Sequence, residues 1–209
     1  MVITVQESQQ YKFSRIGGVL CLDFTNTASW HGSDRSTEHL NDFFDLLRWS
    51  NENGIIGQHA QLVLSEGAER NPAGALTILT RARKLREALH RIFVGVSQRK
   101  SPGRSDMQML NETLDRAPLR FEVQYEESGF SGKRTPGGSE FATVLGPVAW
   151  SAAELLTSEN LDRIKRCAND TCGWLFLDNT KNHSRRWCDM GDCGSRAKAK
   201  RYYQRKTKK

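Results

Sequence analysis

Four cysteines near the end of the chain have the spacing of a metal site. Cys167 and Cys172 are separated by four residues, Cys188 and Cys193 are separated by four, and fifteen residues lie between the two pairs. Zn²⁺ takes four thiolates in a tetrahedron, and two short-spaced pairs on separate turns are the usual way for a chain to supply them. A site closed by four sulfurs leaves no open coordination position. The spacing therefore predicts a structural zinc site.

The cellular compartment helps to distinguish a metal site from the alternative, in which these cysteines are free or disulfide-bonded. The first ten residues have neither the basic nor the apolar region of a secretion signal, so we expect a cytoplasmic protein. No apolar stretch reaches the roughly 18 residues of a membrane span, so no membrane partner is expected. In a reducing compartment such a cluster indicates a metal site, without which this short segment has too little apolar surface to fold. Cys21, alone in an apolar run, is expected to be a buried, inert thiol.

The positive charge is concentrated in the same segment. Residues 161–209 contain 14 Lys and Arg against 5 Asp, whereas residues 1–160 contain 17 Lys and Arg against 19 Asp and Glu. A mildly acidic body with a strongly basic end indicates a polyanionic partner for that end. We therefore expect two domains, at residues 1–160 and 161–209.

The elements around the cysteines suggest how the site is built. Trp174 to Leu177 and Arg185 to Trp187 are expected to form a β-hairpin behind the first cysteine pair, and residues 194–206 have helical propensity. A knuckle, a hairpin and a helix that starts at the last ligands form a treble-clef arrangement. Seven basic side chains on the hairpin and helix are candidates for nucleic-acid contacts: Arg185, Arg186, Arg196, Lys198, Lys200, Arg201 and Arg205.

Three functions fit this module. A rigid, charged helix suits phosphate contact and groove entry, which favours DNA as the partner. The same basic face could instead dock on an acidic protein surface, including the body of this molecule, with zinc acting only as a staple. A nuclease would need a catalytic set beside the knuckle, and only His183 with Asp178 or Asp189 is available there. We therefore expect no enzyme activity.

The first 160 residues are expected to form a helix-rich domain with a small antiparallel sheet, which places the whole chain in the α+β class. The longest helix has an apolar face, and Arg81, Arg83, Lys84, Arg86 and Arg91 lie off it as a solvated face. Apolar periodicity and turn residues predict helices over residues 37–54, 58–69, 74–98, 106–116 and 147–157, a half-buried strand over 119–125, a mobile loop over 129–139 and a returning strand over 141–145. The short apolar run 18–26 fits a buried strand or a strand-to-loop corner.

These motifs resemble a known family. Cys172 to Asp178, Arg185 to Met190 and Cys193 to Lys198 resemble the CGNR zinc finger, although Ser195 replaces the Asn of the namesake Cys-Gly-Asn-Arg motif. Serine is itself a good N-cap, so the capping role of that position is expected to survive. Residues 20–27, followed by 46–49, resemble the ABATE domain that accompanies this finger. The resemblance implies a bacterial, cytoplasmic transcription regulator whose N-terminal domain senses a small-molecule effector. Palindromic targets would imply a homodimer.

Asp23 and Asn26 carry the N-terminal motif. In a sensing domain they would hydrogen-bond the effector. Their alternative role is to close the turn after a strand and satisfy backbone groups, and this is the role that we favour.

Overall fold

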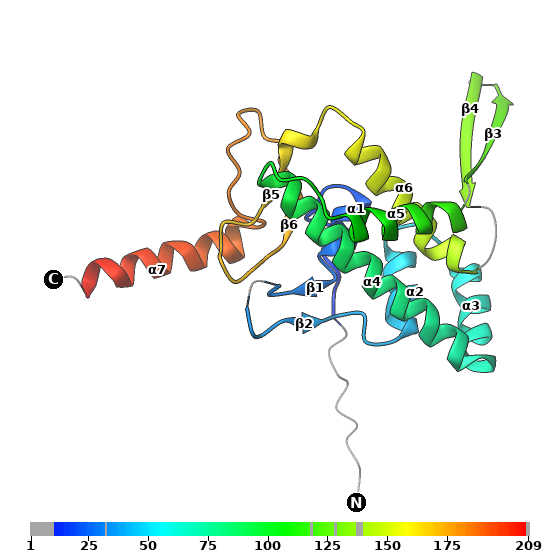
Figure 1. Cartoon of the computed structure of the whole chain (residues 1–209), viewed down its shortest axis with the longest axis horizontal. Coiled ribbons are helices and arrows are strands. Elements are labelled where there is room, and N and C mark those ends of the chain that lie inside the picture. Colours follow the sequence, from blue (N-terminus) through cyan, green and yellow to red (C-terminus); the bar gives the residue numbers. More distant parts are fainter. Residues whose placement is uncertain (1–10, 32, 118, 128, 137–139, 208–209) are drawn as a thin grey trace, which may run out of the picture.

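The fold is a helical body with three two-stranded antiparallel sheets. In a computed structural model of the chain, the structure describes residues 11–31, 33–117, 119–127, 129–136 and 140–207. Within that part of the chain there are seven α-helices, and the sheets pair β1 with β2, β3 with β4 and β5 with β6. Helix α4 crosses the middle of the body, while α7 and the β3–β4 ribbon extend from opposite ends (Figure 1). The predicted helix-rich α+β class is confirmed.

Helix α1 (Leu20–Thr25) lies at the centre of the body, where a strand or corner was predicted, so that prediction is wrong. All its residues from Cys21 to Thr25 are buried, and it packs against α4, α6 and β6. A short run that is buried on every side shows neither the helical nor the strand period. The turn before it needs two glycines: a Cβ on Gly17 would lie 2.8 Å from Asp23, and Gly18 has φ +81°.

Helices α2, α3 and α5 pack against α4, and most of the bounds of these four helices were predicted. They are α2 (Phe43–Glu52), α3 (Gln58–Arg70), α4 (Pro72–Ser97) and α5 (Arg104–Arg116). Helix α2 begins later than predicted. Thr37 lies instead in strand β2 (Thr37–Glu38), which pairs with β1 (Ala28–Ser29), and Asp42 caps α2 by accepting the Asp45 N–H at 2.8 Å. The predicted stop at Asn53 and Gly54 is confirmed, with Gly54 at φ +72°.

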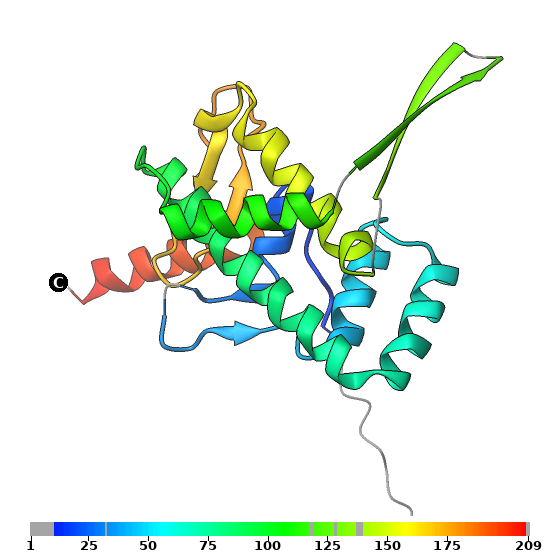
Figure 2. The ribbon, with the colours of Figure 1, turned by 45° about the vertical axis from the view of Figure 1, so that its right-hand side comes forward.

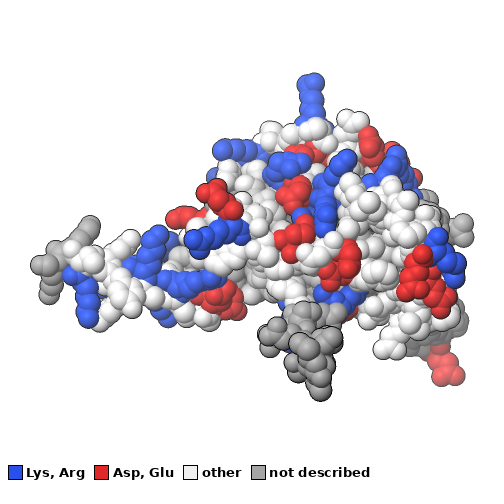
Figure 3. Space-filling view, turned by 90° about the horizontal axis from the view of Figure 1, so that it is seen from below, with Lys and Arg blue, Asp and Glu red and all other residues white. Residues whose placement is uncertain are grey.

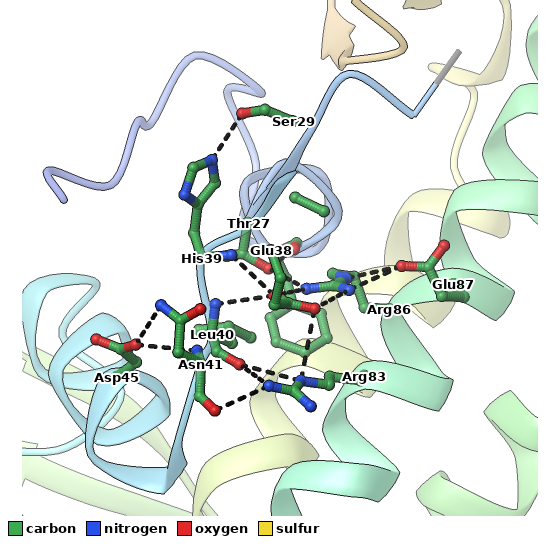
Figure 4. A network of polar contacts seen from close by, with 12 residues as sticks. Thr27, Ser29, Glu38, His39, Leu40, Asn41, Asp45, Arg83, Arg86 and Glu87 are labelled. Carbon is green, nitrogen blue, oxygen red and sulfur yellow. Dashed lines mark hydrogen bonds and ion pairs between the residues drawn. The ribbon is translucent and has the colours of Figure 1, made fainter. Parts of the chain in front are cut away.

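The predicted solvated face of α4 is wrong for Arg86 and Arg83, whereas Lys84 and Arg91 are exposed as predicted. Arg86 is 4% exposed and forms a bidentate ion pair with Glu38, at 2.5 Å from Nη1 to Oε1 and 2.7 Å from Nη2 to Oε2 (Figure 4). Its Nε also donates to Glu87 at 2.9 Å. Arg83 donates to the backbone carbonyls of Leu40 and Asn41, as Figure 4 also shows. These arginines therefore fasten the β2 segment to α4.

Strands β3 (Leu119–Glu126) and β4 (Gly129–Pro136) form a ribbon that projects from the body (Figure 2). Strand β4 replaces the predicted mobile loop, apart from residues 137–139, which lie outside the described residues. The predicted strand β3 is present, but it is not half-buried: Val123 is 64% exposed and Tyr125 74% exposed. The Tyr125 ring packs instead on Phe130 of β4, with a centroid distance of 4.9 Å.

Helix α6 (Glu140–Leu156) returns to the body and includes the residues predicted as a second strand. Pro147 lies inside this helix rather than at its start. Gly146 packs closely on α5's C-cap, since a Cβ there would lie 2.9 Å from that of Ala117, and Trp150 Nε1 donates to the Ala117 carbonyl at 2.9 Å. Within the described residues, no helix is long and apolar enough to cross a membrane.

Candidate metal centre and nucleic-acid interface

A short hairpin positions the first pair of cysteines. Strand β5 (Ile164–Arg166) pairs with β6 (Leu175–Leu177), and Cys167 extends the pairing by donating its N–H to the Trp174 carbonyl at 2.8 Å. The turn reaches Cys172 through an N–H···O bond to Asn169 at 3.0 Å. The predicted hairpin partner of β6, Arg185 to Trp187, is therefore wrong. The knuckle lies inside the hairpin rather than before it.

The loop that follows β6 is held by the buried carboxylate of Asp178. One oxygen accepts from Lys165 Nζ at 2.6 Å and from the Arg185 N–H at 3.0 Å; the other accepts from the N–H and hydroxyl of Thr180. Burial opposes the charge of this group, but the bonds from Lys165 and Thr180 dominate and hold the pKa of Asp178 well below its usual range. The loop is thus fixed where it must deliver Cys188.

Cys193 lies in a five-residue π-helical turn, η2 (Met190–Gly194), which continues directly into α7 (Ser195–Lys206). Asp189 caps this turn by accepting the Asp192 N–H at 2.8 Å. Ser195 is the first residue of α7 and does not cap it; its hydroxyl donates to the Met190 carbonyl at 3.2 Å. The capping role expected for Ser195 is therefore not present, and the side-chain cap belongs to Asp189 at the start of η2.

The four sulfurs come together as the spacing predicted. All are buried, and they lie within 4.8 Å of one another, with 3.7 Å between Cys172 and Cys188. Four sulfurs at about 2.3 Å from a tetrahedral zinc ion would lie about 3.8 Å apart, so the cage fits the ion. Zinc bound here is coordinatively closed, and its role is to hold the hairpin, the loop and α7 together.

Nitrogen donors surround the sulfurs. Cys167 Sγ accepts from the Cys188 N–H at 3.4 Å, and Cys193 Sγ accepts from Asn169 Nδ2 at 3.6 Å and from Arg196 at 3.5 Å. Such outer contacts orient metal ligands and offset the negative charge of four thiolates around one dication. The first turn of α7 is therefore bound to the metal cage through Arg196 as well as through the chain.

The zinc module packs on the body, which no local sequence pattern indicated. The amide of Asn26 pairs with both backbone groups of Leu175, donating to its carbonyl at 2.8 Å and accepting its N–H at 3.0 Å. Trp174 Nε1 donates to the Ala28 carbonyl at 2.9 Å, and His90 contacts the Gly173 carbonyl at 2.9 Å. Ile164, Leu175 and Leu177 share one buried cluster with α1 and α4. Body and finger have a common core.

Asp23 is buried beside this junction. Its Oδ1 accepts the Gly17 N–H at 2.8 Å, and the Gly17 carbonyl in turn accepts the Leu177 N–H at 2.8 Å. Burial raises the pKa of Asp23 to about 6. The contacts of Asp23 and Asn26 are those of backbone-satisfying side chains, and both groups use their polar atoms inside the protein.

Three of the seven candidate nucleic-acid residues have internal partners. Arg185 donates to the carbonyls of Trp187 and Cys188, and its guanidinium lies 4.1 Å from the Phe176 ring centroid, so it is part of the module's framework. Arg196 pairs with Asp192 at 2.6 Å and stacks over Trp30 at 4.6 Å. Arg186 is exposed and lies over Trp187 at 5.3 Å.

The other four, Lys198, Lys200, Arg201 and Arg205, lie along α7. No residue of this helix is buried, and Tyr202 and Tyr203 are 56% and 67% exposed. The helix extends away from the body, and Lys and Arg side chains lie along its length (Figure 3). Among the residues that the structure describes, none of these four makes an ion pair with a carboxylate. The helix presents its charge to solvent rather than to the body.

Comparison with protein families agrees with this architecture. Residues 18–159 match the model of the ABATE family, described as a putative stress-induced transcription regulator. The chain belongs to this family. Residues 163–206 of this ABATE protein match the CGNR zinc finger, which is the segment that carries the four cysteines. Both resemblances inferred from the motifs are therefore confirmed. No curated protein matches the chain.

Proposed function

We propose that this ABATE protein is a DNA-binding transcription regulator in which the zinc-tethered helix α7 contacts a duplex. The observation that carries the proposal is the state of α7: twelve residues, none of them buried, with six Lys and Arg and no acidic residue. A helix without an apolar face gains nothing from packing on its own body. Its charge and exposure fit a polyanion.

Helix α7 needs both a tether and a partner. An isolated helix of this length is marginal in water, because nucleation is costly and the lysines and arginines repel one another. The metal cage fixes its first turn through Cys193 and Arg196. The major groove of B-DNA admits an α-helix, and flanking phosphates would neutralise its side chains. Palindromic targets would call for a two-fold dimer.

The rival functions are less well supported. Docking of α7 on the body of the same molecule would bury part of the helix, and no residue of α7 is buried. Docking on an acidic protein partner would use the same exposed charges and is separated from DNA binding by experiment. For nuclease chemistry, the Asp178 carboxylate already accepts four hydrogen bonds and Asp189 accepts the Asp192 N–H, so both carboxylates that could act with His183 are engaged in holding the loop and the η2 turn. We propose no enzymatic activity.

The test is the salt dependence of duplex binding. Lys198, Arg201 and Arg205 are changed together to alanine, and the control changes three exposed basic residues of the body, Arg70, Lys84 and Arg104. Each lost phosphate contact should lower the steepness of log affinity against log salt by about 0.9. For the helix variant, we therefore expect this slope to fall by nearly three and the affinity to fall by about tenfold or more. The control, which removes the same charge, should match the wild type.

Two results would reject DNA as the partner. One is duplex binding that is indifferent to salt. The other is an equal loss in the helix variant and the control, which would show that net charge alone, and not α7, attracts the duplex.

A further inference from the structure

A basic hollow lies beside the zinc module, between α4 and the loop that precedes Cys188. It has a volume of about 460 Å³ and is walled by the C-terminal end of α4, by β5 and by the loop that carries His183 to Arg186. Lys165, Arg166, Arg185 and Arg186 line it, and no carboxylate does. Sites for small molecules have volumes of roughly 300–1,000 Å³, so the hollow can admit a ligand.

The charges around this hollow are not balanced within the protein. Lys165 is neutralised by Asp178 at 2.6 Å. Arg166, Arg185 and Arg186 have no carboxylate within ion-pair distance in the described part of the chain. Three guanidinium groups that share one hollow repel one another, and an anion between them would remove that cost.

One of these groups also lacks a hydrogen-bond acceptor. The Nε of Arg166 is buried and has no partner among the described residues. Leaving a buried donor unpaired is destabilising, and more so for a charged group. Arg166 lies on β5, directly after Lys165 and before the ligand Cys167, so a rigid strand holds it in place. Arg166 also lines the hollow, so its guanidinium belongs to the unbalanced charge there.

We infer that this hollow binds a phosphate group, with Arg166 and Arg186 as its main contacts. Guanidinium groups present paired N–H donors in a plane that matches the oxygens of phosphate. The phosphate belongs either to the backbone of the duplex held by α7, which rests on the proposed function, or to a free phosphorylated small molecule. Arg185 supports the site from the framework, since it already donates to backbone carbonyls.

The experiment measures two ligands on the zinc-loaded full chain. Pyrophosphate binding is followed by calorimetry, and binding of a 20-base-pair duplex is followed by fluorescence anisotropy at several salt concentrations. The site variant is Arg166→Gln with Arg186→Gln. The control, Arg70→Gln with Arg104→Gln, removes the same charge from α3 and α5. Zinc content is measured in each protein. If the double variant loses zinc, Arg186→Gln alone, at an exposed position, replaces it.

We expect the site variant to lose about tenfold or more in pyrophosphate affinity, because hydrogen bonds between charged groups are stronger than neutral ones. The control should keep the affinity of the wild type. A parallel drop of about two in the salt slope for the duplex identifies the DNA backbone as the source of the phosphate. An unchanged duplex slope identifies a free phosphorylated ligand. If the wild type fails to bind duplex at all while pyrophosphate binding stays sensitive, the proposed function fails and this site stands. Pyrophosphate binding that is absent, or equal in variant and control, overturns the inference.

Discussion

Asn26 and Asp23 join the two ends of the chain through the backbone. Asn26 pairs with Leu175 as a neighbouring strand would, and Asp23 fixes the Gly17 turn that itself pairs with Leu177. The sequence placed both residues in a motif and offered a turn-closing role among its alternatives. It could not show that the partner of Asn26 lies 149 positions away, because a side chain that satisfies a distant backbone leaves no local pattern.

Removing the Asn26 amide should loosen the junction. In Asn26→Ala the N–H and carbonyl of Leu175, a fully buried residue, lose their partners, which should lower the free energy of unfolding by about 2–4 kcal/mol. Urea unfolding measures this. Asn41→Ala, which removes an exposed amide that donates to Asp45, should cost less than about 1 kcal/mol. Equal losses in the two variants would contradict the pairing role.

The buried carboxyl of Asp23 should make stability depend on pH. Its pKa is about 6 in the folded protein against 3.8 for the ordinary group. Between these values the folded state binds more protons, so the free energy of unfolding falls as pH rises, and the penalty is complete above pH 6. Asp23→Asn keeps an acceptor for Gly17 without the charge. The free energy of unfolding of this variant should therefore exceed that of the wild type by about 2–3 kcal/mol at pH 7.5 and equal it near pH 4.

Comparing the two proteins at each pH cancels the effect of acid on the zinc thiolates. A difference in unfolding free energy that stays constant between pH 5 and 7.5 would show that burial does not shift this carboxyl.

Among the helices and strands, apolar periodicity predicted those helices that bury a single face. Helices α3, α4 and α5 were predicted within about two residues because each has an apolar stripe and a clear stop. The failures have a shared cause. Helix α1 and the start of α6 are apolar without a period, and β4 consists of residues typical of loops that are ordered by pairing with β3. In each case the neighbouring element decides the structure.

The candidate site shows the same division. Cysteine spacing predicted the ligand cluster because four sulfurs serve one ion whatever lies between them. The pairing partner of β6 was missed because β5 (Ile164–Arg166) precedes the first cysteine and is only three residues long. Arg185 was read as a surface charge, yet its fork serves the carbonyls of Trp187 and Cys188. Composition cannot distinguish an arginine that donates to backbone carbonyls of its own chain from one that is free to bind a phosphate.

The tie between β2 and α4 should be costly to break. Arg86→Met fills a similar volume but leaves Glu38 without its main partner, which should lower the free energy of unfolding by about 2–3 kcal/mol, less than for a fully buried pair because Glu38 is 30% exposed. Thermal and urea unfolding measure this. Arg70→Met breaks an exposed pair at 3.8 Å with Glu66 and should change stability by less than about 0.5 kcal/mol. A loss below 1 kcal/mol in Arg86→Met would mean that the network is not structural.

At the scale of the whole molecule, the finger and the body are one packed unit with a single projecting helix. Hydrogen bonds of Asn26, Trp174 and His90 hold the hairpin on the body, and Arg196 bonds the first turn of α7 to the zinc cage. The two family matches cover residues 18–159 and 163–206, and the buried core is shared between these two segments. Any event in the body that moves the hairpin would therefore move α7.

The central claim is that the zinc cage presents α7 to a duplex. It is tested most directly by measuring the affinity of one protein sample for duplex DNA with zinc bound, after chelation, and after zinc is restored. Without metal the first turn of α7 loses its anchor, so we predict a loss of about tenfold or more in affinity, recovered when zinc returns, while circular dichroism shows the helices of the body intact. Equal affinity with and without zinc would contradict the claim.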